Sequence, residues 1–204
     1  MESRRGPISA ADLVREKEEK LRTDPEYRAQ VEAVEAERSE RVRALREAER
    51  PIVADLNRAG VSVDSVWDLV NTSDPYPIAL PILLDHLERG GYPDRVMESL
   101  GRALAVKPSV VWWDRLRVLY LAARNPGEED GTAVALAACA TKDQLDDLIG
   151  FLSMDERGES RIYFVRPIKR LGGERGRQVL ESLRHDATFG REATAVLLGK
   201  SPNR

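Results

Sequence analysis

The chain has few of the residues that mark several large classes of protein. Its 204 residues include one cysteine, two histidines and only 5% aromatic side chains, which is low for an all-β protein. The single thiol, Cys139, cannot form an intramolecular disulfide. Its place in the apolar run 133–140 predicts a small buried core residue and fits a reducing compartment.

Long apolar stretches are also absent from the sequence. No run approaches the ~18 apolar residues that a membrane-spanning helix needs. The residues after Met1 are charged, so no secretion signal is predicted. The sequence therefore predicts a soluble, cytoplasmic protein that has no membrane partner.

Patterns that carry catalytic chemistry are missing as well. His86 and His185 each stand beside an aspartate, but neighbouring helical residues point about 100° apart, so neither pair forms a chelate or a relay. Both histidines are expected on the surface or in a groove. No metal-ligand spacing and no glycine-rich loop after a strand is present. We therefore expect no enzyme activity, no cofactor and no metal.

Charge is abundant, at 33% of residues, and unevenly distributed. The formal net charge of −3 combines a balanced block (1–50), an acidic block (51–150) and a basic block (151–204). Such a total gives no global attraction to nucleic acid or anionic membranes. Patterning predicts a charged helical N-terminal region at 1–50, short connecting helices at 51–75, and a repeat region at 76–204.

Two helices are predicted in the N-terminal region. Ser9 and Asp12 have the spacing of a helix N-cap, and Asp24-Pro25 starts a second helix that runs to about residue 50. Pro51 is expected to kink or break it. A further short helix should end near Gly60, where glycine adopts a left-handed conformation easily.

The second helix carries a thin apolar seam, which Arg38 interrupts. Its members recur at roughly 3.5-residue spacing and are Tyr27, Val31, Val34, Val42 and Leu45. One interpretation is a coiled coil that makes a homodimer through residues 25–50. The other is a solvated helix whose narrow stripe packs on the rest of its own chain.

From Leu80 onward, pairs of short amphipathic helices recur. The last leucines of the first helices are Leu87, Leu121, Leu152 and Leu183, at intervals of 34, 31 and 31 residues. An arginine opens the second helix in three of the four pairs (Arg95, Arg161 and Arg191). Because each pair exposes an apolar face that only a neighbouring pair can bury, this period predicts an α-solenoid.

On this pattern, residues 80–200 resemble degenerate HEAT-type repeats of the armadillo-like superfamily. Pro81 and Pro167 are similar to the prolines of kinked helices in such repeats. The resemblance implies an all-α fold: a short, curved HEAT-like α-solenoid of about four helix pairs, whose second helices line the concave face. It implies no particular chemistry.

The segment from Val111 to Arg117 is similar to a segment of HEAT-like alkyl-purine DNA glycosylases. The similarity lies in Trp112, Trp113 and Asp114. The family's catalytic aspartate is expected four residues after the second tryptophan, and that position holds Arg117, which cannot stabilise a cationic sugar in the same way. The alternative is that the two tryptophans are a core residue and an amphipathic surface residue.

Basic residues gather near the C-terminus. Phe164, Ile168 and Leu171 fall on one face of a helix predicted over 159–171. The residues expected to form a basic groove on the other face and at the start of the next helix are Tyr163, Arg166, Lys169, Arg170, Arg175 and Arg177. The alternative is an ordinary solvated face with intramolecular ion pairs.

Two functions follow from these observations. The first is a non-enzymatic scaffold, adaptor or inhibitor that binds a protein partner through the solenoid surface. The alternative is a nucleic-acid-binding, DNA-repair-like protein that uses the C-terminal basic groove. The basic residues, together with Trp112 and Trp113, are the candidate partner-binding residues.

Overall fold

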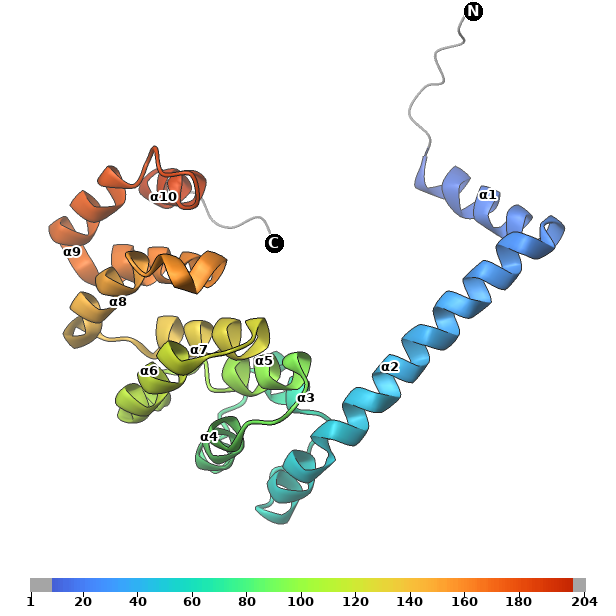
Figure 1. Ribbon diagram of the computed structural model, residues 1–204, viewed down its shortest axis with the longest axis horizontal. Coiled ribbons are helices and arrows are strands. Elements are labelled where there is room, and N and C mark those ends of the chain that lie inside the picture. Colours follow the sequence, from blue (N-terminus) through green and yellow to red (C-terminus); the bar gives the residue numbers. More distant parts are fainter. Residues whose placement is uncertain (1–8, 200–204) are drawn as a thin grey trace, which may run out of the picture. The chain divides into compact units, whose positions relative to one another are not determined.

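The computed structural model describes residues 9–199, and every regular element in that range is helical (Figure 1). The α-helices are α1 (Ala10–Thr23), α2 (Pro25–Arg58), α3 (Val66–Asn71), α4 (Ala79–Arg89), α5 (Asp94–Ala103), α6 (Trp113–Ala122), α7 (Pro126–Cys139), α8 (Leu145–Leu152), α9 (Val165–Ser182) and α10 (Gly190–Leu197). The 3₁₀ helices are η1 (Lys107–Trp112), η2 (Lys142–Gln144) and η3 (Asp155–Phe164). The predicted all-α class is confirmed over these residues.

The chain divides into two compact units, with the division between Glu47 and Ala48. We call residues 9–47 the arm and residues 48–199 the body. The regions 51–75 and 76–204, which the sequence analysis separated, both belong to the second unit.

The helix ends in the arm follow local capping chemistry. The Ser9 hydroxyl accepts the backbone N–H of Asp12 at 3.2 Å, which satisfies a donor that α1 cannot. The Asp24 carboxylate accepts the backbone N–H groups of Glu26 and Tyr27, at 3.0 Å each. Both predicted helix starts are confirmed.

A kink or a break is expected at Pro51; the break does not occur, because α2 includes Pro51 and ends at Arg58. A proline inside a helix costs about 3 kcal/mol, since it removes a hydrogen bond and crowds the preceding turn. Ile52 and Leu56, in the same stretch, are completely buried and offset that cost by packing. Gly60 has φ +86°, the left-handed conformation predicted for the helix end.

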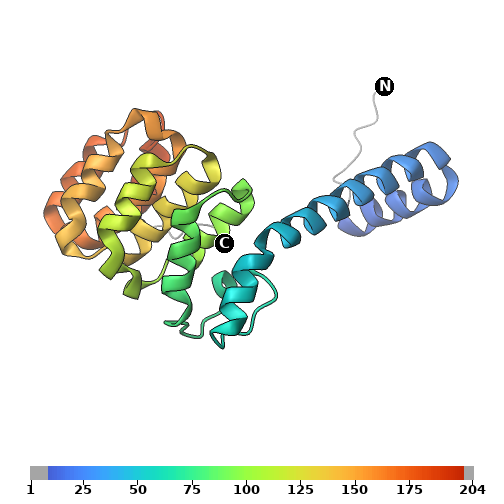
Figure 2. The ribbon, with the colours of Figure 1, turned by 60° about the horizontal axis from the view of Figure 1, so that its bottom comes forward.

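In the body, successive helices pack against one another. Helix α4 packs against α5, α5 and α6 against α7, α8 against α9, and α9 against α10. Figures 1 and 2 show these helices following in order from α4, in green, to α10, in red. Helix α9 contains a non-helical residue, Gly173 (φ +52°), which lies between the helix predicted over 159–171 and the next predicted helix.

The burial of two repeat positions, Leu121 and Arg161, is notable. Leu121 was aligned with Leu87 and Leu152, which are buried, but Leu121 is exposed and Tyr120 occupies the core position beside it. Arg161 is buried, and its guanidinium donates to the carbonyl oxygens of Leu152 and Gly158 and to a carboxylate in η3. This arginine therefore holds the turn before α9 together.

The expected surface position of His86 is wrong, because its side chain is buried, whereas His185 is exposed. His86 Nε2 donates to the Asp55 carboxylate at 3.0 Å, and Nδ1 lies 2.7 Å from Tyr92 Oη. The carboxylate comes from α2, far back in the sequence, rather than from the adjacent Asp85. These bonds join α2, α4 and the α4–α5 loop.

Replacing Asp55 by asparagine tests this connection. Hydrogen bonds from Arg58 and His86, in that order, lower the pKa of Asp55. Such a carboxylate stabilises the fold above its unfolded-state pKa of about 4, and this stabilisation is lost as the pH falls through the lower folded-state pKa. We expect Asp55→Asn to lower the melting temperature at pH 7, and the difference from wild type to shrink below about pH 4. Calorimetry that shows a constant difference would contradict the assignment.

Candidate partner-binding surface

Helix α6 exposes apolar side chains. Its inward face carries Trp113, Leu116 and Tyr120, all of which are buried. The outward face carries Val118, which is 60% exposed, and Leu121, which is 36% exposed. We call Val118, Leu121 and Ala122 the α6 ridge, because residues three and four apart lie on one helix face.

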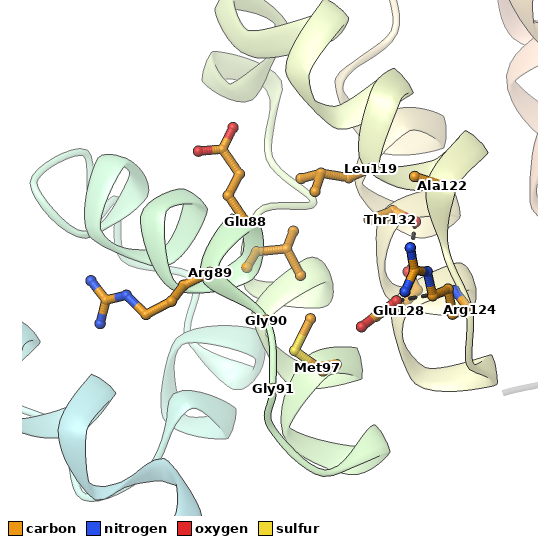
Figure 3. Close-up of a pocket in the computed structure, with 11 residues that line it drawn as sticks. Glu88, Arg89, Gly90, Gly91, Met97, Leu119, Ala122, Arg124, Glu128 and Thr132 are labelled. Atoms are coloured by element: carbon orange, nitrogen blue, oxygen red, sulfur yellow. Dashed lines mark hydrogen bonds between the residues drawn. The ribbon is translucent and has the colours of Figure 1, made fainter.

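A cavity of about 410 Å³ lies beside this ridge (Figure 3). Leu119 and Ala122 of α6 line one side, and Met97 of α5 lies across from them. Gly90 and Gly91, both with positive φ, carry the α4–α5 turn past the opening without adding side chains. Because Ala122 belongs to both, the ridge leads directly to the cavity.

Charged residues of both signs surround this apolar floor. Arg115 donates to both oxygens of Glu88, at 2.6 and 2.7 Å, and this hydrogen bonding is the main reason that the pKa of Glu88 is lowered. On the other side, Glu128 accepts the backbone N–H of Arg124 at 3.1 Å. These hydrogen bonds hold both carboxylates in place at the edge of the cavity.

An exposed apolar ridge beside a cavity that mixes apolar and charged side chains has the composition of a protein-binding surface. A partner side chain that enters the cavity loses its contact with water, and the ridge supplies further apolar area. The charged edge provides directional contacts around that apolar centre.

The two tryptophans predicted to contact a partner have different environments. Trp113 is buried, and its Nε1–H donates to the Asp147 carboxylate of α8 at 2.8 Å. Trp112 is half-buried and lines a separate cavity that also contains Asp143 and Asp147. Arg117 lies 3.8 Å from Asp114. Trp113 therefore connects two helices, and an acidic cavity surrounds the segment that resembles the glycosylases.

Two of the predicted basic residues form ion pairs within the body. Arg166 Nε lies 2.7 Å from a carboxylate oxygen of Glu192 in α10. Arg175 lies 2.6 Å from Asp146 in α8. Each cation is therefore largely neutralised by an acid on a neighbouring helix.

The other basic candidates are spread along α9 and the end of η3. The Tyr163 hydroxyl accepts a hydrogen bond from Arg102 at 3.4 Å, and Arg170 donates to the carbonyl oxygen of Ala137 at 3.2 Å. The two remaining candidates are Lys169 and Arg177. Within residues 9–199, neither forms an ion pair with an acidic residue. The six predicted groove residues therefore include fewer unpaired cations than the sequence indicates.

The α6 ridge and its cavity were not found from the sequence. One signal was present: the run 118–123 contains only apolar or aromatic residues. A helix buried on a single side must turn part of such a run toward solvent. The sequence did not show which part, because that depends on where α4, α5 and α7 pack.

No group of three or more His, Cys, Asp or Glu side chains within 9–199 is arranged to hold a metal ion. None of the helices in that range combines the length and apolarity needed to cross a membrane.

Comparison with protein-family models, with curated proteins and with solved structures gave no match.

Proposed function

We propose that the protein is a non-enzymatic protein-binding module: a HEAT-like α-solenoid of about four helix pairs that acts as a scaffold, adaptor or inhibitor. The in-order packing of α4 to α10 supports the solenoid part of this proposal. The α6 ridge beside its cavity carries the binding part. The ridge belongs to α6, the first helix of its pair, and the cavity beside it is also lined by residues of the second helices α5 and α7.

The chemistry of the ridge favours a protein over other ligands. Covering Val118 and Leu121, which are 60% and 36% exposed, by apolar atoms stabilises a complex by roughly 1–2 kcal/mol in total, and a protein surface supplies such atoms. The cavity is open and continues into the ridge, so a small molecule inside it leaves the ridge uncovered. Exposed apolar patches of this kind typically mark interaction sites.

Nucleic acid receives less support as a partner. The edge of the cavity carries two acids, Glu88 and Glu128, beside two arginines, so it offers no net positive charge to a phosphate backbone. In the basic C-terminal set, Arg166 and Arg175 are each paired with an acid on a neighbouring helix. A phosphate backbone would have to displace those carboxylates before it gained contact.

A binding experiment with a double variant tests the proposal. The wild-type protein captures its partner from an extract of the native host, and the captured partner is then purified and titrated by calorimetry. Val118→Asp with Leu121→Asp places charge on the ridge without changing the core face of α6. We expect a dissociation constant at least tenfold larger, about 1.4 kcal/mol, because carboxylates at the interface must lose water.

Leu198→Asp provides the matched control, since Leu198 is equally exposed, at 61%, but lies beyond α10. Its dissociation constant should stay within about twofold of the wild-type value. Equal capture by the ridge variant and the wild type would show that the ridge is not the binding site. Capture of a nuclease-sensitive species that Arg166→Glu and Arg170→Glu abolish would favour the nucleic-acid alternative.

A further inference from the structure

The apolar seam of α2 continues a face that is buried further along the same helix. Leu45 and Leu56 are eleven residues apart, as are Val34 and Leu45, and eleven residues make about three helical turns. Leu56 is completely buried in the body. Val34, on the same face, is 64% exposed.

No residue from 9 to 48 is buried in the described structure. The seam has the apolar spacing of a buried helix face, but Val34 and Val42 are exposed and its other members are half-buried. An isolated helix gains little stability from its backbone alone, and most helical stability in proteins comes from burial of an apolar face. Residues 27–45 extend over about 28 Å of α2, and within this stretch Val34 and Val42 are exposed, a length that matches one face of another helix.

Charges along the seam indicate what that helix is. Two cations nearby are paired within the arm, Arg41 with Glu37 and Arg43 with Glu40. Arg38 interrupts the seam, and within residues 9–199 no ion pair joins it to another residue. The same holds for Glu35 in that range, one turn before it. The seam thus carries one cation and has one acid at its edge, neither of them neutralised.

A second copy of the chain complements this pattern in one orientation. In a parallel pair, the two Arg38 side chains face each other, which is repulsive. In an antiparallel pair with Val31 opposite Val42, residues whose numbers sum to 73 face each other. Arg38 of each copy then lies opposite Glu35 of the other, and Tyr27 lies near Leu45.

We propose that the arm binds a second copy of this chain as an antiparallel helix pair, with Arg38 of each copy facing Glu35 of the other. The apolar seam supplies the attraction, and the two reciprocal ion pairs set the direction and register. This proposal does not depend on the function of the α6 ridge, since it uses residues of the arm alone.

Charge reversals in the full-length chain test the pairing by sedimentation equilibrium. We expect the wild type to approach twice its monomer mass as its concentration rises. Glu35→Arg places two cations opposite each other at both of these contacts, and Arg38→Glu places two acids there. Each variant should dissociate at least tenfold more readily than the wild type.

An equal mixture of Glu35→Arg and Arg38→Glu should associate again, to within a few-fold of the wild type. In the mixed pair both contacts become attractive, whereas each variant alone has two repulsive contacts. Recovery on mixing also shows that both variants are folded. Arg43→Glu, on the opposite face of α2, is the control and should leave the dimer unchanged.

Three results would overturn the proposal. The first is a wild-type chain that stays monomeric at all concentrations. The second is a dimer that neither reversal weakens, because its interface then lies elsewhere. The third is a dimer that Glu35→Arg does not affect and Arg38→Glu alters, which indicates a parallel pair.

Discussion

Alanine at Gly101 is expected to destabilise the body by about 3 kcal/mol or more, because α5 and α7 approach closely at this residue. A Cβ atom on Gly101 would lie 2.2 Å from the carbonyl carbon of Gly131 and 2.5 Å from its Cα. These are backbone atoms, so no side-chain rotation relieves the overlap. The two helices must move apart, and the core between them loses contact. Urea unfolding followed by circular dichroism measures the loss as a lower midpoint.

Gly150→Ala is the control for this substitution. Gly150 is also helical, lies on the exposed side of α8, and a Cβ there would have no atom within 4 Å. Alanine at this position should stabilise the protein by about 0.5–1 kcal/mol, because glycine loses more backbone freedom on folding. If both variants are as stable as the wild type, α5 and α7 do not pack as closely as described.

Phe164→Ala is expected to cost about 3–5 kcal/mol. Phe164 is completely buried at the end of η3 and lies between two other rings. Its centroid is 4.9 Å from that of Phe151 and 5.4 Å from that of Tyr120, with the Tyr120 ring edge-on. Because these rings come from α6, α8 and η3, the cavity left by alanine lies where three helical elements meet. Calorimetric melting measures the loss.

Tyr120→Phe separates ring packing from hydrogen bonding in the same cluster. This variant keeps the aromatic ring and removes the hydroxyl that lies 3.2 Å from Ser160 Oγ. We expect a loss of about 1 kcal/mol, the usual contribution of one hydrogen bond. A Phe164→Ala effect no larger than the Tyr120→Phe effect would show that the aromatic contacts contribute little.

Where the helices begin and end could be predicted because their signals are local. The Ser9 hydroxyl and the Asp24 carboxylate bond to backbone groups within three residues, so the sequence contains both partners. Gly60 ends α2 in the left-handed conformation that glycine adopts most easily. The same local reasoning failed at Pro51, because burial of Ile52 and Leu56 outweighs the cost of a proline.

The candidate site could be predicted only in part. The basic residues near the C-terminus are visible in the sequence, but the acids that neutralise them are on other helices: Glu192 for Arg166 and Asp146 for Arg175. The exposed position of Leu121 follows from the rotation of α6 against its neighbours. Neither fact is encoded within a few residues of the side chain concerned.

The sequence by itself determined that the described chain is helical, where most helices begin and end, and that apolar seams recur along it. Those properties depend on backbone bonds and side-chain spacing within about one helical turn. Only the tertiary structure decided that His86 is buried against Asp55 and that the α6 ridge faces outward beside a cavity. These depend on contacts between residues far apart in the chain, which the packing of whole helices sets.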